Sequence, residues 1–215
     1  MSYTHNISHF ATPATLALVT SLNNLMKNIH EDLSVTLVGG ALRDYHYAVA
    51  FDVEANIKDF DFILTGPKDE YFDDIYQALK KHTTLNKFVD AYHSPRIARR
   101  GLSGVFKFNY LGCECDVLIY DGKKSISQCI REFDADVNQV ALSRNFSTFD
   151  VFYTEEFKKA FVSGTYKLIN REEVYPAFLC PEPKLQAREM KRLMNLQNKL
   201  PRFEMMDFPE FMERL

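Results

Sequence analysis

One stretch of the sequence, residues 34–66, constrains the fold more than any other. It opens with SVTLVGG, an apolar run that stops at two glycines, and ALRDYHYAVA follows directly with the composition of a helix. It closes with DFDFILTG, in which apolar residues alternate with Asp59 and Asp61. Because side chains on a strand alternate between its two faces, one face is expected to be apolar and the other to carry two like charges. Such neighbours repel each other, and a bound cation or a raised pKa relieves the repulsion.

The other elements of the first half predict a sheet covered by helices. Residues 13–33 and 67–79 carry apolar side chains at steps of three and four, as one face of a helix requires. Two strands follow at 104–110 and 113–121, joined by a hairpin turn at Leu111-Gly112. This order of elements predicts an α/β (α+β) fold with a small mixed sheet under helical cover.

The second half predicts a more helical continuation. Residues 123–143 have the composition of a helix, residues 143–170 that of short strands and turns, and residues 183–200 that of a long basic helix. We therefore expect a first part at 1–124 and a second part at 125–215 that completes it and extends it as helices.

A stripe of large apolar residues marks the C-terminal tail. Its members are Phe203, Met206, Phe208, Phe211 and Met212. We expect the stripe to fold back on the core, and a helix that binds a partner is the alternative.

Composition and charge narrow the class of protein. Of the 215 residues 46% are hydrophobic, enough for a packed core, yet no apolar run approaches the roughly 18 residues that cross a bilayer, so we expect no membrane contact. The four cysteines form no CxxC pair, which favours free thiols in a reducing, cytoplasmic compartment. The net charge of −3 and the pI of about 6.1 argue against a surface devoted to coating nucleic acid. A local basic patch remains at Arg96, Arg99, Arg100 and Lys107, for which a solvated loop is the alternative interpretation.

A third carboxylate is available on the predicted hairpin. In CECDVLI, alternation places Glu114, Asp116 and Leu118 on one face. If this strand lies beside the one that carries Asp59 and Asp61, the three aspartates converge. Asp116 is the better candidate than Glu114 because it lies within the apolar stretch. Oxygen ligands of this kind suit Mg²⁺, which commonly binds carboxylates together with substrate phosphates.

The glycines at the end of the first strand predict an anion site. Gly39 and Gly40 let backbone N–H groups approach an anion, and the helix that follows directs its positive end to the same point. Arg43, in the first turn of that helix, can add a forked donor to phosphate oxygens, and Asp44 can hold a neighbouring backbone group or arginine. Together these groups can hold a triphosphate.

GGALRD followed by DFD resembles the GG-x-x-R-D and D-x-D motifs of the DNA polymerase β-like nucleotidyltransferase superfamily, specifically the head domain of class II CCA-adding enzymes and bacterial poly(A) polymerases. The matching residues are Gly39, Gly40, Arg43, Asp44, Asp59 and Asp61. The resemblance implies that residues 1–124 form a nucleotidyltransferase catalytic head, and that residues 125–215 complete it and add a neck-like helical extension. It also implies that Asp59, Asp61 and Asp116 hold two Mg²⁺ ions, with Mn²⁺ as an alternative.

Two later segments resemble further motifs of the same family. FDADVNQVAL matches a segment whose aspartate and asparagine, Asp134 and Asn138 here, bind the nucleotide; their spacing of four predicts one helical face. The double arginine that precedes this aspartate in the family is replaced by Glu132-Phe133. KLQAREMKRLMNL resembles the motif that contacts the incoming base, with Arg188 and Arg192 as candidates, although the family's E-D-x-x-R is missing.

The activity implied by the resemblance is nucleotidyl transfer. A nucleoside triphosphate such as ATP is the donor, and RNA, with a tRNA 3′ end as one form, is the favoured acceptor because Arg96, Arg99 and Arg100 precede the hairpin. A compact transferase that modifies a small molecule or a protein is an alternative, as is a non-catalytic protein of the same fold that binds a nucleotide or RNA. A homodimer formed through the C-terminal helices is a further expectation.

Overall fold

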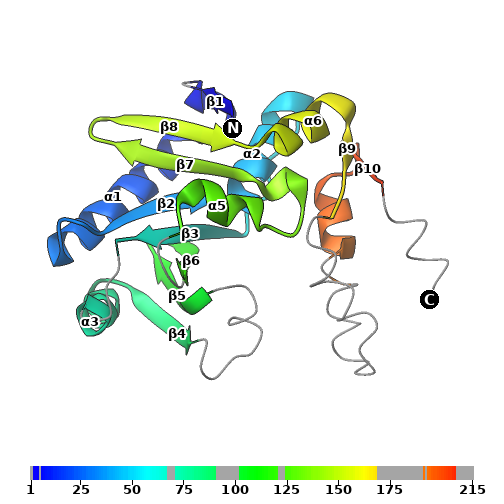
Figure 1. The fold of residues 1–215 in the computed structure, drawn as a ribbon. Coiled ribbons are helices and arrows are strands. Elements are labelled where there is room, and N and C mark those ends of the chain that lie inside the picture. Colours follow the sequence, from blue (N-terminus) through cyan, green and yellow to red (C-terminus); the bar gives the residue numbers. More distant parts are fainter. Residues whose placement is uncertain are drawn as a thin grey trace.

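The computed structural model describes residues 2–4, 6–66, 71–90, 102–120, 124–168, 191 and 193–206 (Figure 1). Within these residues the predicted mixed sheet is confirmed, and it is larger than expected. It has eight strands in the order β1-β8-β7-β2-β3-β6-β5-β4. The strands are β1 (Ser2–Thr4), β2 (Ser34–Val38), β3 (Asp59–Thr65), β4 (Thr84–Asp90), β5 (Leu102–Tyr110), β6 (Cys113–Tyr120), β7 (Val140–Asn145) and β8 (Thr148–Tyr153). Only the β3–β6 pair in this sheet is parallel, and every other neighbouring pair is antiparallel.

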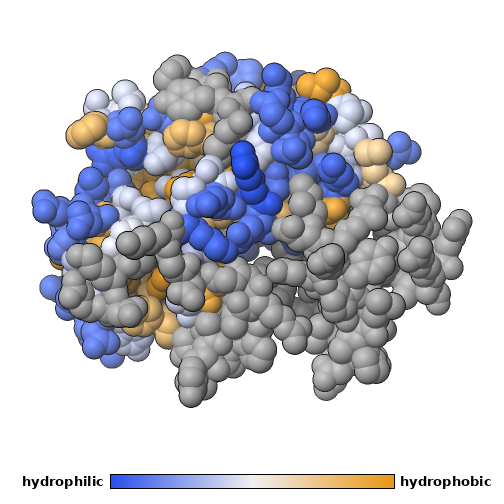
Figure 2. Space-filling view, in the orientation of Figure 1, coloured by the Kyte–Doolittle hydropathy of each residue, from blue (hydrophilic) through white to orange (hydrophobic). Residues whose placement is uncertain are grey.

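Helices cover both faces of the sheet. Consecutive residues of the central strand β3 point to opposite faces, so they pack against different helices. Phe62 packs in the main core with residues of α1 (Pro13–Ile29) and α3 (Phe72–His82). The next residue, Ile63, packs in a smaller cluster with Cys129 and Ile130 of α5 (Ile126–Arg131). In Figure 1, α5 lies in front of the sheet and α1 behind it, and Figure 2 shows that the surface over α5 is hydrophilic.

The local signals at helix ends account for several boundaries. The Thr12 hydroxyl accepts a hydrogen bond from the Thr15 N–H at 3.1 Å, and Pro13 opens α1 at its first position. Ser125 begins α5 through a capping box with Gln128, in which each side chain bonds the backbone of the other residue. The glycine turn after β2 leads directly into α2 (Gly40–Phe51), as the sequence predicts.

Two predictions for the second half are wrong. Residues 123–143 do not form one helix: α5 ends at Arg131, a 3-10 turn follows at η3 (Asp136–Asn138), and β7 begins at Val140. Val140, Ala141 and Leu142 are all buried, and such a run fits a central strand with neighbours on both sides as well as it fits a helix. The predicted strands and turns of 143–170 also contain α6 (Glu155–Ser163), which the Thr154 hydroxyl caps by accepting from the Phe157 N–H.

A second core joins the C-terminal segment to the sheet domain. Residues 193–199 form a helix, and the buried side chains of Leu193, Leu196, Leu200 and Phe203 pack with Tyr47 of α2. The short strands β9 (Thr165–Tyr166) and β10 (Glu204–Met205) pair in parallel beside this cluster. Phe203 therefore folds back as expected, whereas Met206 is exposed; Phe208, Phe211 and Met212 lie outside the described residues. In the part of the chain that the structure describes, no helix is long and apolar enough to span a bilayer.

Candidate active site

The β3–β6 pair brings two of the predicted carboxylates side by side. In the parallel register Asp61 lies opposite Asp116, and Asp59 lies opposite Glu114. Alternation puts Asp59, Asp61 and Asp116 on the sheet face of Ile63, away from the core face. Asp59 is exposed, and Asp61 and Asp116 are half-buried. The strands that carry the three aspartates are thus neighbours, as their convergence requires.

A lysine that was predicted only as part of a surface patch lies at the same place. The β5–β6 register puts Lys107 opposite Asp116, and the Lys107 Nζ forms an ion pair with the Asp116 Oδ2. The two-residue turn at Leu111-Gly112 implies this pairing. In such a hairpin residue 110 lies opposite residue 113, so residue 107 lies opposite residue 116. Among the described residues, no group of three or more His, Cys, Asp or Glu side chains is arranged to hold a metal ion. Asp59, Asp61 and Asp116 therefore do not form a closed three-ligand site in this structure.

Cys115, next to Asp116, points to the opposite face and packs in the main core. Burial, and then the nearby Cys113, Asp116 and Asp61, raise the pKa of the Cys115 thiol to about 12. The thiol is therefore neutral near pH 7 and acts as an apolar core residue.

The glycine turn lies beside the carboxylates. Val38 pairs with Asp61 in the β2–β3 register, and Gly39 follows with a φ of 72°, in the region that favours glycine. The Gly39 N–H donates to the Val140 carbonyl at 3.0 Å, so it extends the sheet and does not point to a ligand. Gly40, the first residue of α2, is left as the candidate backbone donor to an anion at the helix N-terminus.

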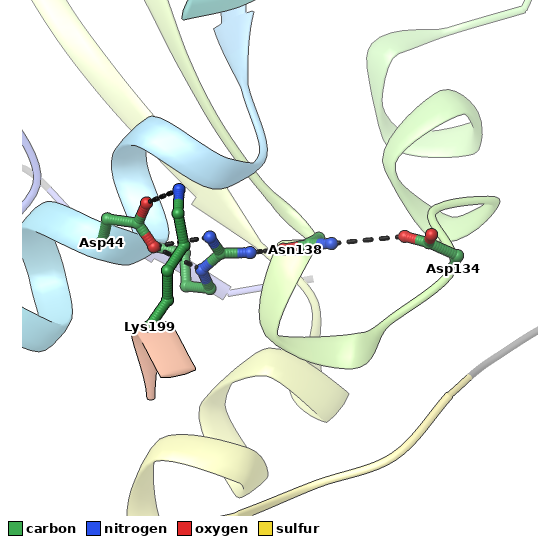
Figure 3. Close-up of polar contacts among 5 residues, drawn as sticks. Asp44, Asp134, Asn138 and Lys199 are labelled. Atoms are coloured by element: carbon green, nitrogen blue, oxygen red, sulfur yellow. Dashed lines mark hydrogen bonds and ion pairs between the residues drawn. The ribbon is translucent and has the colours of Figure 1, made fainter. Parts of the chain in front are cut away.

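Arg43 and Asp44 are buried in a network of charged side chains (Figure 3). The Arg43 Nε donates to the Asp44 Oδ1 at 2.7 Å, and the Arg43 Nη1 donates to the Asn138 Oδ1. The Lys199 Nζ donates to the Asp44 Oδ2 at 2.6 Å. Because Arg43 is only 4% exposed, its guanidinium binds protein partners here, and its role as a phosphate donor stays a prediction.

Asp134 and Asn138 are brought together, but not by a helix. The Asn138 Nδ2 donates to the Asp134 Oδ1 at 3.2 Å, and Asn138 ends the 3-10 turn η3. The predicted helical face is therefore wrong, while the predicted proximity is correct. The buried Asp136 shapes the turn, because its Oδ1 accepts from the Val137 and Lys167 N–H groups. Burial raises the pKa of Asp136 to about 6.

Lys199 also belongs to this network. The sequence does not distinguish it from the other basic residues of the helix predicted at 183–200. The remaining predicted contacts lie outside the described residues. They are Arg96, Arg99, Arg100, Arg188 and Arg192.

Comparison with known proteins identifies the fold. No protein-family model matches the sequence, and a search of curated proteins finds no match. Among solved structures, the Thermotoga maritima CCA-adding enzyme complexed with tRNA is similar to this chain with a TM-score of 0.60 and 14% identity, over 98% of this chain and 44% of that one. A tRNA-processing enzyme in an apo form is similar with a TM-score of 0.50 and 12% identity, over 86% of this chain and 44% of that one. The chain thus spans less than half the length of these two proteins, and at such identities the likeness concerns the fold. The chain therefore shares its fold with part of the CCA-adding enzyme and with part of the tRNA-processing enzyme.

Proposed function

We propose that this chain transfers a nucleoside monophosphate from a nucleoside triphosphate to a hydroxyl group of an RNA, with release of pyrophosphate. The observation that carries the proposal is the register of three neighbouring strands. It places Asp61 beside Asp116 on one side and beside the Val38 end of β2, where the glycine turn begins, on the other. Asp61, with Asp59 two residues before it, can bind the cation of a metal-bound triphosphate, and the N-terminus of α2 can bind its phosphates.

Asp59 and Asp61 are the residues that fit a divalent ion, Mg²⁺ or Mn²⁺. They lie two residues apart on one face at the start of β3, and Asp59 is exposed, so carboxylate oxygens are accessible to a hydrated ion. When bound, such an ion stabilises the negative charge that develops on the phosphate oxygens during in-line displacement. The chain's own groups position the nucleotide: the N-terminus of α2 faces the phosphates, and Asp134 and Asn138 contact the ribose or orient Arg43.

The choice of RNA as acceptor is supported by the CCA-adding enzyme whose fold the chain shares, since that enzyme is complexed with tRNA. Arg96, Arg99 and Arg100 are the proposed acceptor contacts, and Arg188 and Arg192 the proposed contacts with the base. Such a reaction would take place in the cytoplasm.

The test is incorporation of labelled nucleotide. Purified protein is incubated with each labelled triphosphate, with Mg²⁺ or Mn²⁺ and with total cellular RNA, and both labelled RNA and released pyrophosphate are measured. The double variant Asp59→Ala/Asp61→Ala is expected to lose at least about 100-fold of the activity, a typical effect of removing groups that stabilise transition-state charge. The matched control is Asp73→Ala/Asp74→Ala, which removes two exposed carboxylates from α3 and is expected to keep the activity.

The outcomes separate the candidate functions. If pyrophosphate is released but the labelled product resists ribonuclease, the acceptor is a small molecule or a protein and not RNA. Absence of pyrophosphate with every triphosphate, or full activity of the Asp59→Ala/Asp61→Ala variant, would overturn the proposal.

A further inference from the structure

Four side chains form a row across neighbouring strands beside the candidate active site. The registers pair Lys87 of β4 with Lys107 of β5, Lys107 with Asp116 of β6, and Asp116 with Asp61 of β3. Residues paired in this way project from the same face, and neighbouring strands lie about 4.8 Å apart. The row therefore runs from two cations to two carboxylates without an interruption.

The charges in this row hold the Lys107 ammonium at Asp116. Lys107 cannot turn to the other face, because Phe106 and Phe108 on either side of it are buried in the main core. Lys87 behind it is exposed and repels it, while the two carboxylates in front attract it. The side chain of Asp116 is only 19% exposed, so its attraction for the ammonium is screened less than that of a surface pair. The ion pair between Lys107 and Asp116 is the result.

The Lys107 ammonium bonds the Asp116 Oδ2, an oxygen through which Asp116 could share a cation with the neighbouring Asp61. Because a metal ion and an ammonium that bind the same carboxylate oxygen repel each other, the Asp116 Oδ2 serves one of them at a time.

We propose that Lys107 replaces one of the two metal ions that the sequence resemblance implies, so that the site binds a single divalent ion, at Asp59 and Asp61. Lys107 is then a positioning residue that neutralises and orients Asp116. This inference rests on the proposed function, which makes Asp59 and Asp61 a metal site. It concerns the number of ions that bind and not the rate of nucleotide transfer.

The experiment measures the Mn²⁺ stoichiometry of the full chain without nucleotide, by electron paramagnetic resonance of free Mn²⁺ and by calorimetry at one fixed pH. The unaltered protein is expected to bind one ion. Lys107→Met removes the ammonium and keeps a side chain of similar length, and it is expected to bind two ions. Lys107→Arg keeps the charge and is expected to bind one. The matched control is Lys124→Met, which removes a lysine paired with Glu132 at 2.8 Å away from the row and is expected to bind one ion.

Thermal unfolding of each variant verifies that it is folded, and Lys107→Gln replaces Lys107→Met if the latter does not fold. Two ions or none bound by the unaltered protein would overturn the inference, and so would an unchanged stoichiometry when the ammonium is removed. Nucleotide incorporation is measured separately. Transfer activity together with two bound ions would contradict the inference and leave the proposed function intact. The expected stoichiometries without any nucleotide transfer would support the inference and contradict the proposed function.

Discussion

At the scale of single residues, the buried charges near the glycine turn are all matched by partners. Arg43 is enclosed by Asp44 and Asn138, and Asp44 also binds Lys199. A buried charge is tolerated only when it is paired in this way, because the loss of hydration must be offset by direct contacts. The guanidinium that the motif offers to a phosphate therefore joins α2 to the 3-10 turn η3, while Asp44 joins α2 to the C-terminal helix.

Asp136 differs from these residues because its described hydrogen bonds come from the backbone N–H groups of Val137 and Lys167, and the nearby Lys167 charge offsets its burial only in part. Burial raises its pKa from 3.8 to about 6. A carboxyl group whose pKa is raised by folding stabilises the protein fully below its unfolded pKa, and this contribution is lost as the pH rises through the folded pKa. The unaltered protein is therefore expected to lose stability between about pH 4 and about pH 6 through this group.

The Asp136→Asn variant tests this pH dependence. The amide keeps an oxygen for the Val137 and Lys167 N–H groups but cannot ionise, so the gain in urea midpoint over the unaltered protein should grow from pH 4 to pH 6 and then level off. Asp52→Asn, at an exposed position, is the control and should show no such trend. A constant difference between the Asp136→Asn variant and the unaltered protein across this range would contradict the assignment.

At the scale of elements, the turn between β2 and α2 sets both the start of the helix and the end of the strand. Gly39 adopts a φ of 72°, its N–H closes the sheet at Val140, and its carbonyl accepts from the Arg43 N–H at 3.1 Å. One residue therefore joins the sheet to the helix that is proposed to face the phosphates.

Replacement of this glycine separates backbone strain from function. Gly39→Ala is expected to cost about 1 kcal/mol of stability, because an added Cβ would lie in ordinary contact with the Phe133 ring at 3.4 Å and only the backbone is strained. Gly164→Ala is the matched control: it has a φ of 69° with open space around it, and it should cost a similar amount. Nucleotide incorporation should fall only in Gly39→Ala; an equal fall in both variants would remove the turn from the proposed site.

At the scale of the whole molecule, the C-terminal segment is part of the structure that holds the site. Leu200 is fully buried in the second core, and the neighbouring Lys199 reaches Asp44 on α2. Asp44 and Lys199, which are 155 residues apart in the sequence, thus contact each other. This contact and the second core attach α2 to the C-terminal helix.

If this segment unfolds together with the sheet domain, Leu200→Ala should lower the free energy of unfolding by about 2 to 5 kcal/mol in a single transition. Met194→Ala, at a position of the same helix that is 56% exposed, is the control and should change it little. Denaturation is followed both by circular dichroism and by hydrogen exchange of β3 amides. Two separate transitions would show that the C-terminal segment is an independent unit.

Three features of the structure depend on contacts between segments that are separated in the sequence. The buried run at Val140 fits a helix as well as a strand because a short apolar segment lacks a distinguishing period, and pairing with β2 and β8 makes it a strand. The sequence predicts a surface patch for Lys107 because charged residues usually lie in solvent, but the register of the hairpin pairs it with Asp116. Lys199 gave no signal at all, since its partner lies 155 residues away.

Three local elements that carry the chemistry follow from the sequence alone: the glycine turn before α2, the alternation that places Asp59 and Asp61 on one face of β3, and the β5–β6 hairpin. Each depends on residues only a few positions apart, where backbone geometry and hydrophobic period act directly. The parallel pairing of β3 with β6, and the contact of α2 with the C-terminal helix, arise only when the whole chain is folded. Those contacts result from burying the apolar faces of the whole sheet and its helices at once, and no short segment contains that information.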